Sequence, residues 1–362
     1  MLIMFLEKIT ITQFKNYELN IFDFNQRVIG ICGRNGIGKT NLLDAIYYAC
    51  FTKSYFTVSD NLNIGFGKDG LRLEAMFINK NDKHKVVCML KPNSKKEFLV
   101  NDVLYEKLSQ HLGLLPCVMI APDDIDIING GSELRRKFMD TLLSQLNKEY
   151  LQSLILYNKI LQQRNSFLKN AAAQGRVDNA LLEILDLQLK LPANNIYQFR
   201  LEFSKKLIPF IQQFYKEIAN SDEQIDVVYE SRLHEKNIES LLIESRSKDL
   251  TLQRTNVGIH KDDIGILLNG QSFKSTASQG QKKSLLFALK LAEYEMIKQT
   301  KGFSPVILLD DVFEKLDHFR MNNLLKKVCK ENEGQVFITD THKERLINSF
   351  EEIGIQGQII EL

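Results

Sequence analysis

The sequence has few cysteines and no long apolar run. Its five cysteines are widely scattered, and none forms a Cys-x-x-Cys pair. This spacing fits neither a disulfide framework nor a zinc ribbon. No apolar stretch approaches the roughly 20 residues of a transmembrane helix. The apolar run at residues 1–6 is too short for a signal peptide and has no basic residues before it. We therefore expect a cytoplasmic protein with no membrane association.

The chain also lacks a strong net charge. Its formal charge is only +2, so any contact with nucleic acid would depend on local basic patches. The composition, with 44% hydrophobic and 25% charged residues, is that of a globular protein with a core. At 362 residues the chain exceeds one ordinary domain, which predicts two domains or one large domain with an insertion.

Hydrophobic periodicity divides the chain into strand-rich ends and a helical middle. Strands are predicted at 8–14, 19–24, 27–32, 71–78, 85–90, 98–100, 225–229, 264–268, 306–309 and 335–339. Helical periodicity dominates from 132 to about 219. We therefore predict an α/β head formed by residues 1–131 and 222–362, with a helical arm at 132–221 inserted between its two parts.

A phosphate-binding loop follows the apolar strand predicted at 27–32. The segment GRNGIGKT fits the pattern G-x-x-x-x-G-K-[ST], and a helix follows it. A glycine-rich turn could match this pattern by accident, but the position between a buried strand and a helix is the one that phosphate binding requires. The predicted nucleotide contacts are Gly33, Arg34, Asn35, Gly36, Ile37, Gly38, Lys39, Thr40 and Asn41.

Two carboxylates follow the apolar strand at 306–309. At the carboxyl end of a buried parallel strand, Asp310 is expected to bind Mg²⁺ together with the Thr40 hydroxyl, and Asp311 to orient the attacking water. Lys39 is expected to contact the β- and γ-phosphates. Carboxylates also end strands as solvated turn residues, so this pair indicates an active site only in combination with the phosphate loop.

A third motif precedes the helix KKSLLFALKLAE. Ser278, Gln279, Gly280 and Gln281 are predicted to form a second anion site at the helix start. The simpler interpretation is that Ser278 only caps the helix. The order of the three motifs is that of ABC-type ATPases, which favours the nucleotide interpretation.

Several longer segments resemble the RecF family, and the similarity extends over nearly the whole chain. FKNY resembles the family motif F-R-N-Y, RRKFMD resembles R-R-R-F-L-D, and GIHKDD resembles G-P-H-R-D-D. The other matching segments are the extended loop GRNGIGKTNLLDAI, the stretch YNKILQQRNSFLK, SQGQ, and ILLDDVFEKLD.

This resemblance implies an ABC-type P-loop ATPase head with an inserted helical arm. It further implies a monomer that dimerises on ATP, so that ATP lies between the phosphate loop of one copy and Ser278–Gln281 of the other. Slow hydrolysis would reset the protein. The implied partners are duplex and gapped DNA together with RecR and RecO, which help to place RecA. The local basic patches that could support DNA binding are 135–137, 282–283 and 326–327.

The sequence departs from the family pattern at several positions. Phe56 stands where a basic residue is expected, Ile259 and Lys261 replace Pro and Arg, and residues 314–317 differ from S-E-L-D. His342 follows the last predicted strand, where it is either a surface residue or a sensor of the γ-phosphate.

Three other classes of protein remain as alternatives. The ATPase subunit of a membrane transporter normally has a much shorter interval between the phosphate loop and the signature. A structural SMC protein or a zinc-hook ATPase needs long heptad repeats or a Cys-x-x-Cys apex. A small-molecule kinase would leave the SQGQ segment without a role.

Overall fold

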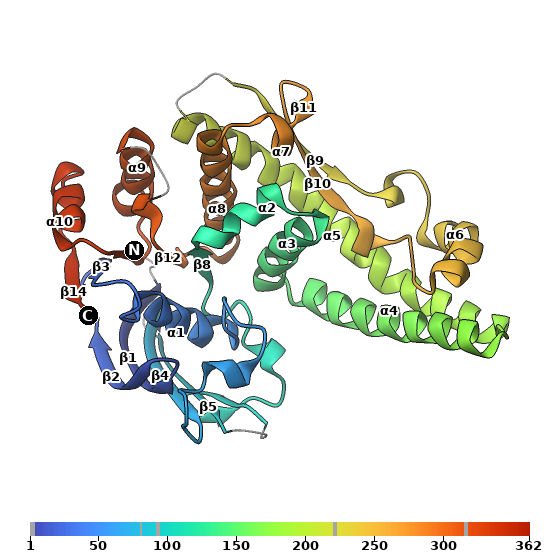
Figure 1. Cartoon of the computed structure of the whole chain (residues 1–362), viewed down its shortest axis with the longest axis horizontal. Helices are drawn as coiled ribbons and strands as arrows, with labels where there is room; N and C mark the ends of the chain where they lie inside the picture. Colours follow the sequence, from blue (N-terminus) through green and yellow to red (C-terminus); the bar gives the residue numbers. More distant parts are fainter. Residues whose placement is uncertain (1–3, 80–81, 92–94, 220–222, 315–317) are drawn as a thin grey trace. The chain divides into compact units, whose positions relative to one another are not determined.

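The computed structural model has the α/β fold expected from the sequence (Figure 1). It describes residues 4–79, 82–91, 95–219, 223–314 and 318–362. Across these ranges, none of the helices combines the length and the apolar character that a transmembrane span requires.

The chain divides into two compact units. Unit 1 comprises Met1–Ile125, Gln213–Ser221 and Ser278–Leu362. Unit 2 comprises Asp126–Gln212 and Asp222–Ala277. Unit 1 is therefore assembled from both ends of the chain.

Unit 1 contains two β-sheets with helices packed on them. Its strands are β1 (Met4–Phe14), β2 (Tyr17–Asp23), β3 (Val28–Cys32), β4 (Leu71–Asn79), β5 (Asp82–Leu90), β6 (Glu97–Val100), β7 (Val103–Leu104), β8 (Cys117–Ile120), β12 (Val306–Leu309), β13 (Val336–Asp340) and β14 (Gln358–Glu361). Its helices are α1 (Lys39–Phe51), α8 (Gln279–Lys301), α9 (His318–Leu325), α10 (Lys343–Glu352) and the π-helix η7 (Lys326–Glu331). The short helices are η1 (Asp60–Asn63), η2 (Leu108–Gln110), η3 (Pro122–Ile125) and η6 (Val312–Glu314).

One sheet of unit 1 is parallel, with the order β14-β3-β13-β12-β8. Every residue of β3, β8, β12 and β13 is buried, as expected for strands covered on both faces. The carboxyl ends of parallel strands meet at one edge of the sheet. The residues that follow β3 and β12 are therefore brought together at this edge.

The other sheet is antiparallel, with the order β2-β1-β4-β5-β6-β7. Helix α1 contacts strands of both sheets, and most of its side chains are buried. The helix ends at Thr52, which adopts a left-handed conformation and donates its N–H to the Tyr48 carbonyl at 2.8 Å. The packing on both sides fixes the position of its first turn, which carries Lys39 and Thr40.

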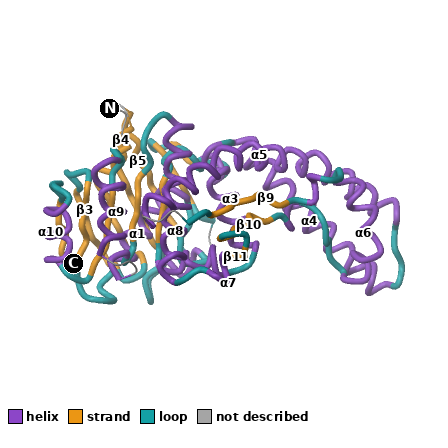
Figure 2. The backbone as a smooth tube through the Cα atoms, turned by 90° about the horizontal axis from the view of Figure 1, so that it is seen from above, coloured by secondary structure: helices purple, strands orange, loops and turns teal. Residues whose placement is uncertain are grey.

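Unit 2 is mainly helical, and the contrast with the strand-rich unit 1 is clear in Figure 2. Its helices are α2 (Asp126–Asn129), α3 (Ser132–Leu146), α4 (Lys148–Gln174), α5 (Asn179–Ala219, whose last residues belong to unit 1), α6 (Ile238–Leu252), α7 (Phe273–Thr276), η4 (Arg232–His234) and η5 (Ile259–Lys261). A small antiparallel sheet has the order β11-β10-β9, with β9 at Ile225–Glu230, β10 at Asp263–Leu268 and β11 at Gln271–Ser272.

A fully buried arginine joins three segments of unit 2. Arg164 of α4 donates from Nε to Asp186 of α5 at 2.7 Å. Its Nη1 donates to Asp249 of α6 at 2.7 Å and to the Thr255 hydroxyl at 2.9 Å. Both Arg164 and Asp249 are completely buried. Since breaking such a pair leaves an uncompensated charge in the interior, these bonds hold the three segments in one arrangement.

The observed units differ from the predicted domains at 222–277. The sequence analysis assigned this segment to the head, whereas Asp222–Ala277 groups with unit 2. The reason is that β9 and β10 pair with each other, with β11 at the edge, rather than with either sheet of unit 1. Helix α6 also packs against α4.

Candidate nucleotide-binding site

The predicted phosphate loop connects β3 to α1 at the carboxyl edge of the parallel sheet. Gly33, Gly36 and Gly38 have φ values of +153°, +81° and +126°, which L side chains rarely adopt. Residues 34–37 are exposed. The loop can therefore present backbone N–H groups to an anion at the start of a buried helix.

Asn16 of the β1–β2 turn and Tyr17, the first residue of β2, hold this loop in place. Asn16 donates from Nδ2 to the Ile37 carbonyl at 2.7 Å, and the Tyr17 hydroxyl donates to the Gly38 carbonyl at 3.0 Å. Asn41 donates in turn to Oδ1 of Asn16 at 2.7 Å. An ideal Cβ on Gly38 would lie 2.8 Å from Asn16 Nδ2, so a larger residue would displace the Asn16 side chain. The motif pattern alone did not reveal this supporting role of the FKNY segment.

The ammonium group of Lys39 lies inside the loop. It donates to the carbonyl of Gly33 at 2.8 Å and to that of Arg34 at 3.2 Å. The side chain is nearly completely buried. Lys39 is thus a buried cation inside the loop, and its contact with phosphate stays a prediction.

Asp310 lies beside Thr40, as the sequence predicted. The Thr40 hydroxyl is 3.1 and 3.0 Å from the two carboxylate oxygens, and the Thr339 hydroxyl donates to Oδ1 at 2.8 Å. Burial, together with the neighbouring charge of Asp311, raises the pKa of Asp310 to about 6, against the opposing hydrogen bonds from Thr339 and Thr40. The carboxylate therefore lies in an environment that favours a nearby cation.

Asp311 follows with a left-handed backbone. Its φ is +45°, and its N–H donates to the Thr339 hydroxyl at 2.9 Å. A positive φ is uncommon for a residue other than glycine. The turn directs the chain away from β12 immediately after Asp310, and Thr339 of β13 supports both carboxylate residues.

The SQGQ segment forms the start of α8. Ser278 caps the helix by accepting from the Gln281 N–H at 3.2 Å, and Gln281 Oε1 accepts from the Ser278 N–H at 2.7 Å. The capping interpretation is thus confirmed. Ser278 and Gln279 are also exposed, and a Cβ on Gly280 would clash with the Arg320 guanidinium. The capping box uses the N–H groups of Ser278 and Gln281, and the second anion site stays a prediction.

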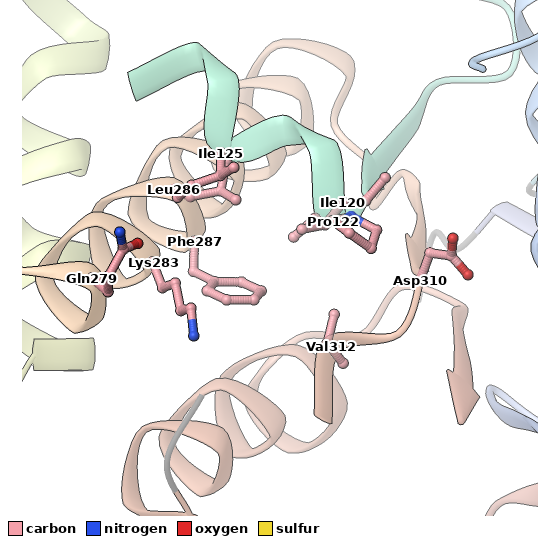
Figure 3. Close-up of a pocket in the computed structure, with 10 residues that line it drawn as sticks. Ile120, Pro122, Ile125, Gln279, Lys283, Leu286, Phe287, Asp310 and Val312 are labelled. Atoms are coloured by element: carbon pink, nitrogen blue, oxygen red, sulfur yellow. The ribbon is translucent and has the colours of Figure 1, made fainter. Parts of the chain in front are cut away.

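A cavity of about 170 Å³ lies between the start of α8 and the edge of the parallel sheet. Figure 3 shows Gln279 and Lys283 of α8 on one side and Asp310 on the other. The remaining wall is largely apolar and consists of Ile120, Ala121, Pro122, Ile125, Leu286, Phe287 and Val312. Two of the three predicted motifs therefore line one space within the same unit.

A buried ionic cluster connects α8 to the segment after β8. Lys290 Nζ lies 3.6 Å from Asp124 and 3.6 Å from Glu293, and the Tyr55 hydroxyl donates to Asp124. Burial raises the pKa of Glu293 to about 7. No sequence motif indicates this cluster, because its members come from three distant segments.

The departures from the family pattern have different structural roles. Phe56 packs against Lys15, whose Nζ lies 5.5 Å from the ring centroid and 2.5 Å from buried Asp44. Lys15 thus provides a positive charge beside Phe56, where the family pattern has a basic residue in the sequence itself. His342 is exposed at the start of α10. Residues 315–317 lie outside the described residues.

Two residues of the predicted basic patches have acidic partners within the protein. Arg135 forms two hydrogen bonds with Asp263, at 2.7 and 2.9 Å. Lys327 pairs with Glu217 and Glu331 at 2.9 Å each. Both residues therefore have an internal structural role.

Comparisons with known proteins agree with this geometry. Residues 8–333 match the family model of an AAA domain. The DNA replication and repair protein RecF of Flavobacterium johnsoniae is 43% identical over 343 residues, which cover 94% of this chain and 95% of that protein. RecF of Bacteroides thetaiotaomicron is 38% identical over 360 residues, covering 99% and 97%. The chain belongs to the RecF family.

Solved structures extend the comparison to the fold. The recombination mediator protein RecF-ATPrS in the RecFOR pathway matches with a TM-score of 0.89 and 30% identity, over 99% of this chain and 96% of that one. The corresponding RecF-ATP structure gives 0.87 and 32%, over 94% and 92%. An Smc head domain from Pyrococcus furiosus gives 0.56 at 15% identity, over 96% and 92%, and so shares the fold. The predicted family and the ABC-type head with an arm are confirmed.

Proposed function

We propose that this RecF-family protein binds ATP and Mg²⁺ at the phosphate loop and acts on DNA as an ATP-dependent dimer. The observation that carries the proposal is the 3.0 Å approach of the Thr40 hydroxyl to the buried carboxylate of Asp310. Two motifs separated by most of the chain meet there at the edge of a parallel sheet. Solved RecF relatives described as RecF-ATP and RecF-ATPrS share the fold.

The phosphate loop would bind the triphosphate through backbone N–H groups and one cation. Lys39 would exchange its bonds to the Gly33 and Arg34 carbonyls for phosphate oxygens. Asn16 and Tyr17 would keep the loop open by holding its last carbonyls. The remaining contacts would come from residues 35–38 and 41.

Thr40 and Asp310 fit a magnesium site. Both offer oxygen ligands, and Mg²⁺ is commonly bound by one or two protein oxygens together with substrate phosphates. Burial is the main cause of the raised pKa of Asp310, and a bound cation would lower this pKa again. When bound, Mg²⁺ would neutralise phosphate charge in the transition state.

Asp311 is proposed to orient the water that attacks the γ-phosphate. Its position one residue beyond Asp310, with a left-handed backbone fixed by Thr339, directs it away from the strand. Hydrolysis would then act as a slow switch that ends the ATP-bound state.

The second half of each ATP site is proposed to come from another copy of the chain. Ser278 and Gln279 are exposed at a helix start that can bind an anion, and Gly280 and Gln281 complete the segment. ATP would lie between the phosphate loop of one copy and this segment of its partner. The ATP-dependent dimer would bind duplex or gapped DNA and cooperate with RecR and RecO to place RecA in the cytoplasm.

The nucleotide assignment is tested by comparing two variants. Lys39→Ala removes the loop cation, so ATP affinity should fall at least tenfold, which corresponds to about 1.4 kcal/mol. Asp311→Asn should retain ATP affinity and lose hydrolysis. Binding of a fluorescent ATP analogue and release of phosphate measure the two steps separately. Normal turnover by Asp311→Asn would contradict its proposed role, and unchanged affinity in Lys39→Ala would contradict the site.

A further inference from the structure

The segment between α6 and β10 folds into a closed loop. His260 donates from Nε2 to the Thr255 carbonyl at 3.1 Å, and the Tyr157 hydroxyl donates to His260 Nδ1 at 2.7 Å. Burial lowers the pKa of His260 to about 4, so the ring is neutral near pH 7 and can donate at one nitrogen while accepting at the other. The bond between His260 and Thr255 closes the loop. Arg254 precedes Thr255 and Lys261 follows His260, so the two cations lie at the closed end of the loop.

A second buried arginine fixes the base of the loop. Arg200 donates from Nη1 to the Ile259 carbonyl at 2.8 Å and to Asp262 at 2.9 Å. Its Nη2 donates to Asp140 at 2.7 Å. Arg200 is almost completely buried. The loop is thus held by interior bonds, while Arg254 and Lys261 remain exposed.

Two neighbouring arginines of α3 behave differently at this loop. Arg135 is locked to Asp263 by two hydrogen bonds. Arg136 instead donates from Nη1 to the carbonyl of Asp262 at 2.6 Å, directly beside Lys261. Its remaining donors are not used by any carboxylate within the part of the chain that the structure describes. Arg136 therefore adds a third cation next to Lys261.

The nearby carboxylates are occupied by other donors. Asp249 binds Arg164, and Asp262 binds Arg200. Over the described ranges, none of Arg136, Arg254 and Lys261 forms an ion pair. The pKa of Lys261 is lowered, first by partial burial and then by the charges of Arg254 and Arg136, which agrees with this close grouping.

We propose that Arg136, Arg254 and Lys261 form a phosphate-binding site on unit 2 that contacts the backbone of duplex DNA. This inference rests on the proposed DNA function. Three cations that form no ion pair among the described residues attract a polyanion, and guanidinium groups match the geometry of phosphate oxygens. Because the loop is held from the interior, these side chains are positioned before DNA arrives. The site is not expected to distinguish DNA sequences, because phosphate contacts do not depend on the bases.

The test is the salt dependence of duplex binding by the full-length chain with ATP and Mg²⁺. The variants are Arg136→Ala, Arg254→Ala and Lys261→Ala, and the matched control is Lys148→Ala, an exposed lysine at the start of α4. Anisotropy of a labelled duplex is measured from about 50 to about 200 mM salt. Each variant should bind more weakly and lower the slope of log K against log salt by about 1, whereas Lys148→Ala should match the parent protein.

The possible outcomes separate this site from the proposed function. If the parent protein fails to bind duplex, the DNA function is wrong. If it binds, and the three variants keep its slope and show an unchanged melting temperature, the site is wrong. Inorganic phosphate is the second probe, and it should displace no more duplex than chloride at equal ionic strength. Selective displacement by phosphate would assign the cluster to a free anion and overturn the DNA assignment.

Discussion

The buried arginines of unit 2 and the buried carboxylate of Asp310 in unit 1 differ in their partners. In unit 2, Arg164 and Arg200 each bind two carboxylates, so each of these two buried guanidinium groups has negative partners. In unit 1, the buried carboxylate of Asp310 accepts from the Thr40 and Thr339 hydroxyls, forms no ion pair among the described residues, and has a raised pKa. Paired charges of the first kind fix a structure. A buried charge of the second kind costs stability until a ligand provides the partner, which is typical of a functional site.

The largest expected effect comes from breaking the paired state in unit 2. Arg164→Met leaves the buried Asp249 carboxylate without its cation, which should lower the free energy of unfolding by about 3–5 kcal/mol. Urea unfolding followed by circular dichroism measures this loss. Lys169→Met, an exposed position on the same helix, is the control and should change stability little. A loss below 1 kcal/mol in Arg164→Met would show that the pair does not fix the unit.

The opposite result is expected from removing the unpaired charge in unit 1. The pKa of Asp310 in the folded protein is about 6, above the ordinary value of 3.8 for an aspartate. The folded protein therefore holds its proton more tightly, so stability falls as pH rises from about 4 to about 6 and stays low above that range. Asp310→Asn should stabilise the nucleotide-free protein by up to about 3 kcal/mol at pH 7.

This difference between Asp310→Asn and the parent protein should disappear near pH 4. Melting curves measured without nucleotide across this range test the prediction. Asp123→Asn, at an exposed carboxylate, controls for the removal of one negative charge. A stability difference that does not change with pH would contradict the assigned environment of Asp310.

The smallest effect concerns the support of the phosphate loop. Tyr17→Phe removes the hydroxyl that donates to the Gly38 carbonyl, and it should cost about 0.5–1.5 kcal/mol of stability. ATP affinity should fall several-fold, because the loop is less well held. Tyr105→Phe, a half-buried tyrosine of the same unit, is the control. Equal ATP affinity in the two variants would show that the β1–β2 turn does not support the loop.

The sequence predicted the parts of the fold that are local in the chain. The strand at 27–32, the phosphate loop and the following helix lie within one segment, and β12 ends at Leu309, directly before Asp310, as expected. The order of the sheet was not predictable in the same way. Strand β8 has only four residues, and β14 pairs with β3 from the other end of the chain. Such pairings depend on contacts that no local pattern encodes.

The candidate site shows the same limit. Lys39, Thr40 and Asp310 were identified by motif, and Thr40 and Asp310 do lie together. Arg135 and Arg136 could not be told apart, because both are basic and neighbouring in the sequence. Only the position of Asp263 shows that Arg135 is used internally. The distinction depends on a partner more than 100 residues away.

The most direct measurement of the proposed function is the mass of the protein in solution with and without ATP. The Asp311→Asn variant, which should bind ATP without hydrolysing it, is analysed by light scattering with Mg²⁺. We predict a monomer without nucleotide and a dimer with ATP. Adding Ser278→Arg should preserve ATP binding and abolish the dimer, because the exposed start of α8 can no longer accept the nucleotide of a second copy. A dimer of equal stability without ATP, or one that survives Ser278→Arg, would contradict an ATP site shared between two copies.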